Sequence, residues 1–228
     1  MSGFNFGMTG ESAVRTSRRM FAPWGIYDVV FKNIEVKEFQ GKKDPSATYK
    51  CISITFEDSD FYFPVNIWFP KDGDDERRSY NGANGGTVEM PSNFEVTMNM
   101  VKQTAQVLNP SGFEKMQAAS SKFKSFDDVA NALVKILTPV KGKQTKIKLI
   151  GRNRDGKVQA DVPRIVAINK EGELYICDNY IGDKLYFTDY EEGKKNEYKN
   201  ASPSKIEDPV VTTDIDTNTS GFELDDLL

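Results

Sequence analysis

One stretch of the sequence, residues 143–190, combines a basic strand with nearby aromatic side chains. In the first strand of this stretch, apolar Ile147 and Leu149 alternate with basic residues. The basic residues of this strand are Lys146, Lys148, Arg152 and Arg154. A period of two with one apolar and one basic face is typical of a half-buried strand that shows its charges to solvent. The pattern predicts a surface for a polyanion, and the alternative is an ordinary solvated sheet face.

A second set of residues suits the same kind of ligand, because it places aromatic rings on the outward face of two expected strands. The segments Thr48–Glu57 and Phe61–Phe69 alternate, and their inner rows are apolar. Their outward aromatic residues are Tyr49, Tyr62 and Trp68. Binding of single-stranded nucleic acid needs aromatic platforms for bases and cations for phosphates, and each stacked base contributes roughly 1–3 kcal/mol. The loop over residues 70–91 adds side chains that we expect to fold over the ligand, namely Arg77, Arg78 and Tyr80.

The first expected strand, Gly25–Phe39, changes phase partway along its length. Apolar residues alternate up to Phe31 and resume one position late at Ile34. A slip of this kind predicts a β-bulge and a sharply bent strand. Closing a small barrel requires such bending.

The order of the elements predicts an α+β chain that is mainly β. Three strands precede two amphipathic helices, Asn93–Leu108 and Ser125–Leu137, the second capped by its serine. The basic strand comes next, followed by a hairpin with apolar runs at 162–168 and 174–177 and a further strand at 182–190. Five strands with helices between the third and fourth is the order of an OB-fold, a five-stranded Greek-key barrel. OB-folds bind oligonucleotides on strands two and three, where the outward aromatic row lies.

Charge is divided unevenly along the chain. The net charge is −4, with 30 basic and 34 acidic residues. Residues 206–228 hold seven acids and no base, so the remainder has 30 basic against 27 acidic residues. We expect three parts: a flexible basic arm at 1–23, a nucleic-acid-binding domain at 24–190, and a disordered acidic tail at 191–228 with an apolar tip.

Several classes of function are disfavoured by composition. The chain has no histidine, which removes Ser-His-Asp catalysis and His-ligated zinc. Its two cysteines, Cys51 and Cys177, form no CxxC motif, and the acids of residues 72–76 do not fit a calcium loop. Neither a membrane-spanning run nor the apolar region of a signal peptide is evident. We therefore expect a protein that is not an enzyme and needs neither a metal nor a cofactor.

These features together resemble those of phage-encoded single-stranded DNA-binding proteins, which share an OB core and an acidic C-terminal tail. The resemblance covers residues 25–190 by element order and 206–228 by composition. It implies a protein of the infected bacterial cytoplasm that coats single-stranded DNA in replication, recombination and repair. It also implies that the tail recruits partner enzymes through its tip, which is Phe222, Glu223, Leu224, Asp225, Asp226, Leu227 and Leu228. Bacterial members end in Pro-Phe, and this chain does not.

Other functions remain open on the sequence alone. A phage structural or assembly protein can use the same kind of β domain, because a fold does not fix function. A strand-annealing recombination protein would share the chemistry of the first hypothesis. Self-association is also possible. A carboxylate metal-dependent nuclease is disfavoured, because the sequence lacks a spaced set of two acids and a lysine on adjoining strands.

Overall fold

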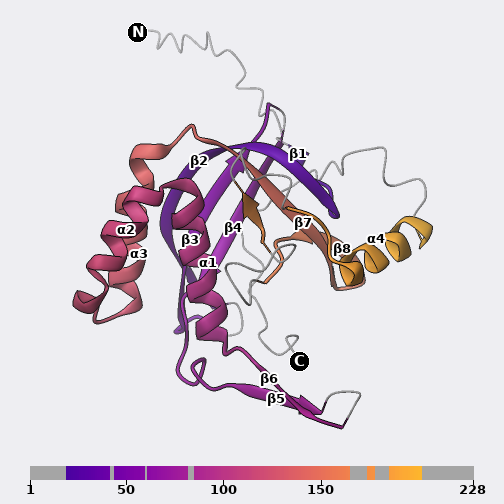
Figure 1. Cartoon of the computed structure of the whole chain (residues 1–228), viewed down its shortest axis with the longest axis horizontal. Helices are drawn as coiled ribbons and strands as arrows, with labels where there is room; N and C mark the ends of the chain where they lie inside the picture. The colour runs from indigo at the N-terminus through magenta and orange to yellow at the C-terminus, as the bar shows by residue number, and fades with distance from the viewer. Residues whose placement is uncertain are drawn as a thin grey trace, which may run out of the picture.

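The structure, a computed structural model, combines one strongly curved and mostly antiparallel sheet with four α-helices in the residues that it describes (Figure 1). The described residues are 19–41, 44–59, 61–81, 85–164, 174–177 and 185–201. The strands are β1 (Arg19–Met20), β2 (Gly25–Gln40), β3 (Thr48–Glu57), β4 (Phe61–Trp68), β5 (Arg78–Asn81), β6 (Thr87–Met90), β7 (Gln144–Arg154), β8 (Lys157–Asp161) and β9 (Ile176–Cys177). The helices are α1 (Asn93–Leu108), α2 (Pro110–Ala118), α3 (Phe126–Leu137) and α4 (Asp189–Ala201), with short 3-10 turns at Ser120–Lys122 and Thr138–Val140. This confirms the predicted α+β class.

Strand β2 is long enough to pair with two partners. Its first residues, from Gly25 to Val30, pair with β7, and its residues from Val30 to Gln40 pair with β3. The register with β3 shifts between Phe31 and Asn33, which leaves Lys32 as the extra residue of a bulge. The predicted phase slip is therefore confirmed, and it keeps apolar side chains on one face on both sides of the bend.

The strands follow the order β1-β4-β3-β2-β7-β8, and β9 also pairs with β7. All of these pairings are antiparallel except that of β1 with β4. Within the described residues this path is open at both ends, so a closed five-stranded barrel is not seen there. The strand predicted at 162–168 is irregular at 162–164, and its other residues lie outside the described part of the chain. The strand predicted at 182–190 is wrong over its described residues, because 185–188 are irregular and Asp189 begins α4.

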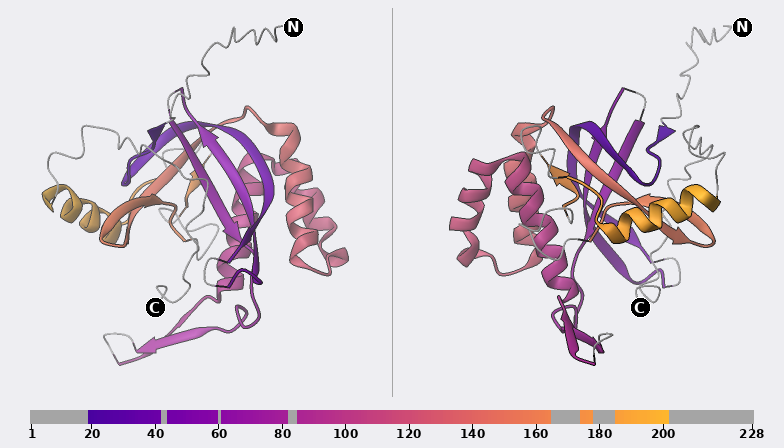
Figure 2. Two further views of the ribbon diagram at one scale, coloured as in Figure 1. Left: turned by 180° about the vertical axis from the view of Figure 1, so that it is seen from behind. Right: turned by 45° about the vertical axis from the view of Figure 1, so that its right-hand side comes forward.

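The hydrophobic core lies between one face of the sheet, called the inner face, and the helices α1 and α3 (Figure 2). Both helices begin with a capping box, Ser92 with Glu95 and Ser125 with Asp128. The inner rows of β3 and β4 are almost fully buried, as predicted, at Ile52, Ile54, Phe56, Phe63, Val65 and Ile67. The opposite, outer face includes the aromatic row predicted from the sequence.

A buried tyrosine joins helix α1 to the last described strand. Tyr175 is fully buried, and its hydroxyl is hydrogen-bonded to the Thr104 hydroxyl. Burial raises the pKa of this tyrosine well above its usual value. Gln103 donates a further hydrogen bond to the carbonyl of Ile176 at 3.5 Å. These contacts hold α1 against the end of the sheet, and no periodic pattern in the sequence predicts them.

Several expectations for the ends and loops were wrong. The loop expected over residues 70–91 contains the β5–β6 hairpin, which projects away from the body (Figures 1 and 2). The arm expected at 1–23 includes strand β1, and the segment expected to be disordered from 191 begins within helix α4. Helix α2 was not predicted. In the described part of the chain, no helix is long and apolar enough to cross a membrane.

Helix α4 is fixed to the outer face of β7 by a buried ion pair. Lys148 is fully buried, and its Nζ lies 2.9 Å from a Glu191 carboxylate oxygen and 3.1 Å from the Tyr186 carbonyl oxygen. The carboxylate of Glu191 also accepts a hydrogen bond from the backbone of Thr188, which begins the helix in the manner of a capping box. The prediction that Lys148 shows its charge to solvent is therefore wrong, because α4 and the segment before it cover that position.

The ion pair gives a prediction about stability. Glutamine at position 191 still accepts the capping hydrogen bond but does not neutralise Lys148. We expect Glu191→Gln to lower the free energy of unfolding by about 3–5 kcal/mol, because it leaves a buried charge without its carboxylate. Adding Lys148→Met should recover much of this loss. Urea unfolding followed by circular dichroism measures both effects.

A matched control exists one residue along the same helix. Glu192 pairs with Lys195 at 3.1 Å, but its side chain is 44% exposed. Glu192→Gln should change stability by roughly 1 kcal/mol or less, as for other exposed pairs. Equal effects at the two positions would contradict the assignment of the buried pair as the contact that holds α4.

Candidate nucleic-acid interface

Three aromatic side chains gather on the outer face where β2, β3 and β4 meet. Phe39 lies opposite Tyr49 in the β2–β3 register, and Trp68 enters from β4. The ring centroids of Phe39 and Trp68 are 5.6 Å apart with an interplanar angle of 49°. All three side chains are half-buried, so each has an accessible part. We call Phe39, Tyr49 and Trp68 the aromatic cluster.

Two lysines border the aromatic cluster. The Lys71 Nζ lies 4.6 Å from the centroid of the Tyr49 ring, close enough for a cation–π contact. Lys37 lies on β2 opposite Cys51, and Trp68 lies opposite the same cysteine from the other side. Lys37 pairs with Glu35 at 3.2 Å, whereas no carboxylate of the described residues pairs with the Lys71 amine. The cluster therefore combines exposed ring surface with cations at its edge.

Cys51 lies in the centre of this outer surface and is fully buried by its neighbours. Burial raises the pKa of its thiol to about 11. Because the thiolate is the reactive form, this cysteine is a packing residue at neutral pH.

The predicted basic row on β7 is paired with carboxylates. Lys146 lies 2.7 Å from Asp28, and Arg152 and Arg154 lie 3.2 Å and 3.0 Å from the same carboxylate oxygen of Asp161. The Asp161 carboxylate thus contacts both arginines. Lys148 is enclosed as described above and does not belong to an exposed surface.

The structure separates the β7 row from the aromatic cluster. Lys146 lies opposite Asp28 near the start of β2, whereas Tyr49 lies opposite Phe39 near its end. The two β2 positions are eleven residues apart, which is about 36 Å of strand at roughly 3.3 Å per residue. The predicted stacking and phosphate-binding residues are therefore not one compact site but two regions along a bent strand.

The remaining predicted residues lie apart from the aromatic cluster. Tyr62 lies opposite Glu57 and next to Met20 of β1, and burial raises the pKa of its hydroxyl. Arg77 is bound by two carboxylates, those of Glu95 and Glu89, so it does not lie free over the sheet. Arg78 and Tyr80 belong to β5 of the projecting hairpin. The tip residues Phe222 to Leu228 lie outside the described part of the chain.

Sequence reasoning missed three members of this region, namely Lys37, Phe39 and Lys71. Lys37 and Phe39 could be predicted from the sequence, because the alternation that resumes at Ile34 places both on the outer face. The β2–β3 turn then sets Phe39 opposite Tyr49. Lys71 follows the end of β4, and no periodic signal marks its position over the ring.

A scan of the sequence against protein-family models gives no match, and a search of the curated proteins gives none either.

The packing of the outer face predicts slow thiol chemistry. Both cysteines are fully buried, and the raised pKa of Cys51 makes its thiolate about a hundredfold rarer at pH 8 than for an ordinary thiol. We expect the native protein to react with Ellman's reagent far more slowly than the urea-unfolded protein. Reactivity and loss of stability should both increase as the pH rises toward 11, because folding favours the neutral thiol. Rapid reaction of one thiol per chain at pH 8 would contradict the packing over Cys51. Loss of that reaction in Cys51→Ser would show that Cys51 is the thiol concerned.

Proposed function

We propose that this protein binds single-stranded DNA and that the aromatic cluster is its stacking platform. The observation that carries the proposal is the set of neighbouring half-buried rings of Phe39, Tyr49 and Trp68 with Lys71 over one of them. Unpaired bases stack on such rings at roughly 1–3 kcal/mol each, with little dependence on sequence. The bordering lysines supply the cations that phosphates need.

The strand arrangement supports the same proposal. Strand β2 pairs with both β3 and β7, and three helices are inserted between β4 and β7. These are properties that we expect of a Greek-key barrel of the OB type, and we propose that a later strand completes it. In OB-folds the second and third strands bind oligonucleotides. The corresponding strands here are β3 and β4, which hold Tyr49 and Trp68.

The basic strand β7 extends the proposed surface. Arg152 and Arg154 both contact the Asp161 carboxylate, and the planar guanidinium group of arginine suits phosphate as well as carboxylate. Lys146 can exchange Asp28 for a phosphate at the surface. We propose that DNA stacks at the aromatic cluster and makes mainly ionic contacts at β7.

The acidic tail completes the proposal. Residues 206–228 hold seven acids and no base, and they end in apolar residues. We propose that this segment recruits replication and recombination enzymes through its tip while the folded part coats and protects DNA.

The aromatic cluster gives the first binding prediction. Trp68→Ala should weaken binding to poly-dT about 5- to 150-fold, which corresponds to one stacked base at roughly 1–3 kcal/mol. It should leave the salt dependence nearly unchanged. Lys71→Gln should instead reduce the slope of log K against log salt by about 0.7, the value for one phosphate contact on a single strand. Fluorescence titration at several salt concentrations measures both effects.

A control variant tests whether removal of any exposed lysine has the same effect. Lys135→Gln removes an exposed lysine from the last turn of α3, away from the sheet's outer face, and should change neither quantity. Tighter binding to duplex than to single strands would contradict the proposal, as would a folded Trp68→Ala variant with unchanged affinity. Absence of single-strand binding even at low salt would favour the structural or assembly role. Rapid pairing of complementary strands would favour an annealing protein.

The tail gives a second binding prediction. A tethered anion competes with phosphate at high effective concentration, on the order of millimolar for a short flexible linker. Deleting residues 206–228 should therefore tighten single-strand binding, most strongly at low salt, where screening is weakest. Leu227→Ala with Leu228→Ala should leave DNA affinity intact but lose partner enzymes in a pull-down. Unchanged affinity after the deletion would show that the tail does not compete for the DNA surface.

A further inference from the structure

Helix α4 covers part of the β7 surface that the proposed function gives to DNA (Figures 1 and 2). The bases of that surface are Lys146, Arg152 and Arg154, which alternation places on one face of β7. Arg152 is six positions after Lys146, which corresponds to about 20 Å of strand. Lys148 lies on the same face within this gap, fully buried and in contact with Glu191 of α4.

The Glu191 carboxylate occupies the place that a phosphate would take in this row of cations. The Lys148 Nζ lies 3.2 Å and 2.9 Å from its two oxygens. Carboxylate and phosphate both bind an ammonium group through charged oxygens, so they compete for the same cation. Asp189 and Glu192 are further acids in the first turn of the helix. A strand that follows β7 would therefore meet an acidic helix end at the centre of its path.

The other residues of α4 add little to its attachment. None of its thirteen residues is buried, and isolated helices of this length are only marginally stable in water. The remaining ion pairs that the described residues form with α4 lie within the helix, Lys194 with Glu197 and Lys195 with Glu192. The Lys195 amine also lies 4.4 Å from the centroid of the Phe187 ring, just before the helix. The buried pair is therefore the main ionic contact between α4 and the sheet.

A glycine weakens α4 at a position where packing does not require one. Gly193 lies in the interior of the helix, and a Cβ placed there would meet no atom within 4 Å. Glycine in a helix interior lowers the stability of the helix relative to alanine, because it loses more conformational freedom on folding. Easy unwinding is the property that a displaceable segment needs.

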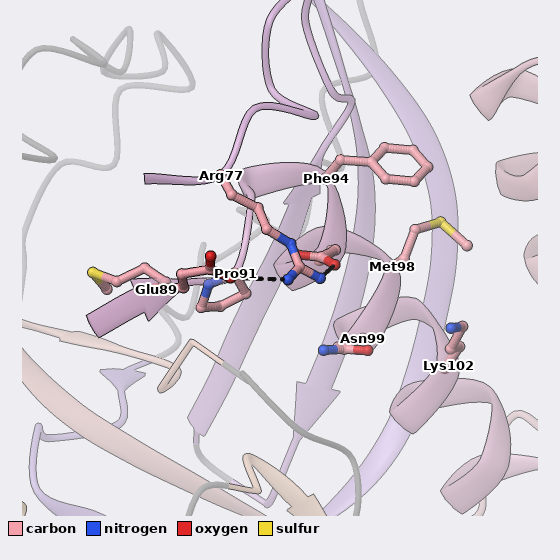
Figure 3. A pocket seen from close by; sticks show the side chains of 9 residues that line it. Arg77, Glu89, Pro91, Phe94, Met98, Asn99 and Lys102 are labelled. Atoms are coloured by element: carbon pink, nitrogen blue, oxygen red, sulfur yellow. Dashed lines mark hydrogen bonds and ion pairs between the residues drawn. The ribbon is translucent and has the colours of Figure 1, made fainter. Parts of the chain in front are cut away.

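A cation elsewhere in the molecule shows how unlike Lys148 is to an ordinary paired base. Arg77 joins the β5–β6 hairpin to α1 through Glu89 and Glu95, beside a groove of about 440 Å³ (Figure 3). Its side chain is 58% exposed, so water already solvates the guanidinium group. The side chain of Lys148 is 0% exposed, so its pairing with Glu191 must offset a large desolvation penalty. Release of α4 would remove this penalty, because water would then hydrate both charges.

We propose that α4 is a displaceable cover, which closes the β7 surface in the free protein and leaves it when single-stranded DNA binds. This inference rests on the proposed function and adds its regulation. A phosphate of the strand takes the place of the Glu191 carboxylate on Lys148, and the row of cations from Lys146 to Arg154 becomes continuous. The free protein binds DNA more weakly than its open form does, because part of the binding free energy is used to release the cover.

Two substitutions shift the cover in opposite directions. Glu191→Gln removes the buried ion pair, so it should tighten binding to oligo-dT by about tenfold or more. Gly193→Ala strengthens the helix, so it should weaken that binding by about two- to fivefold, the range for this change in a helix interior. Stability should change in the opposite sense to affinity, falling in the first variant and rising in the second. Fluorescence titration and urea unfolding of the full chain measure the two quantities.

Two further variants separate the cover from a general effect of charge. Glu192→Gln removes one negative charge from the same turn of α4 but leaves the buried pair intact, so it should change oligo-dT affinity less than about twofold. Equal effects of Glu191→Gln and Glu192→Gln would overturn the proposal. Lys148→Met added to Glu191→Gln should lower the slope of log K against log salt by about 0.7 relative to Glu191→Gln alone, the value for one phosphate contact.

Hydrogen exchange shows the movement of the cover directly. Saturating oligo-dT should speed amide exchange in residues 192–201 of the wild type and should not speed it in β3. Slower exchange in α4 with DNA bound, or unchanged affinity in both Glu191→Gln and Gly193→Ala, would overturn the cover and leave the proposed function intact. Failure of the wild type and both variants to bind oligo-dT at low salt would overturn the proposed function and the cover together.

Discussion

The bend in β2 is the constraint on which the rest of the sheet depends. One continuous strand pairs with β7 at its start and with β3 at its end, and the two partners extend in different directions. The extra residue at Lys32 shifts the phase, so Phe31 before the bulge and Ile34 after it both point into the core. Without this shift, the second half of the strand would turn its apolar row to the outer face and its polar row to the core.

Hydrophobic periodicity predicted the elements that bury one face in the core. Alternation located β2, β3 and β4, and the helical period with its serine caps located α1 and α3. Other elements depend on information that such patterns lack. The helical period of α1 stops before Pro110, but this proline also begins α2, where proline suits the first position. The short β5–β6 strands are joined to the body by Arg77 and Glu95, a contact that no periodicity reveals. Helix α4 has no buried residue among its thirteen, so it offered no apolar stripe to recognise.

Alternation also predicted part of the candidate site, but it could not predict which of those residues another element covers. Alternation correctly placed Tyr49 and Trp68 on the outer face, and pairing geometry brings Phe39 beside them. Alternation also placed Lys148 on that face, but a period of two says nothing about what covers a face. Glu191, 43 positions later in the chain, encloses it. Removing an ammonium group from water is unfavourable unless a charge and hydrogen bonds replace the water, and the sequence gives no sign of that replacement.

The number of basic residues in a strand differs from the net charge that its surface presents. The lysines and arginines of β7 lie beside acids from β2, β8 and α4, so the local excess is smaller than the sequence indicates. The aromatic cluster and the basic side chains of β7 lie toward opposite ends of β2, and β2 holds them at a fixed separation. A ligand that uses both regions must span that strand, and a ligand that is too short must choose between rings and cations. Because unpaired nucleic acid presents a base and a phosphate at every step, it can satisfy both ends of such a surface at once, whereas a compact anion can satisfy only one.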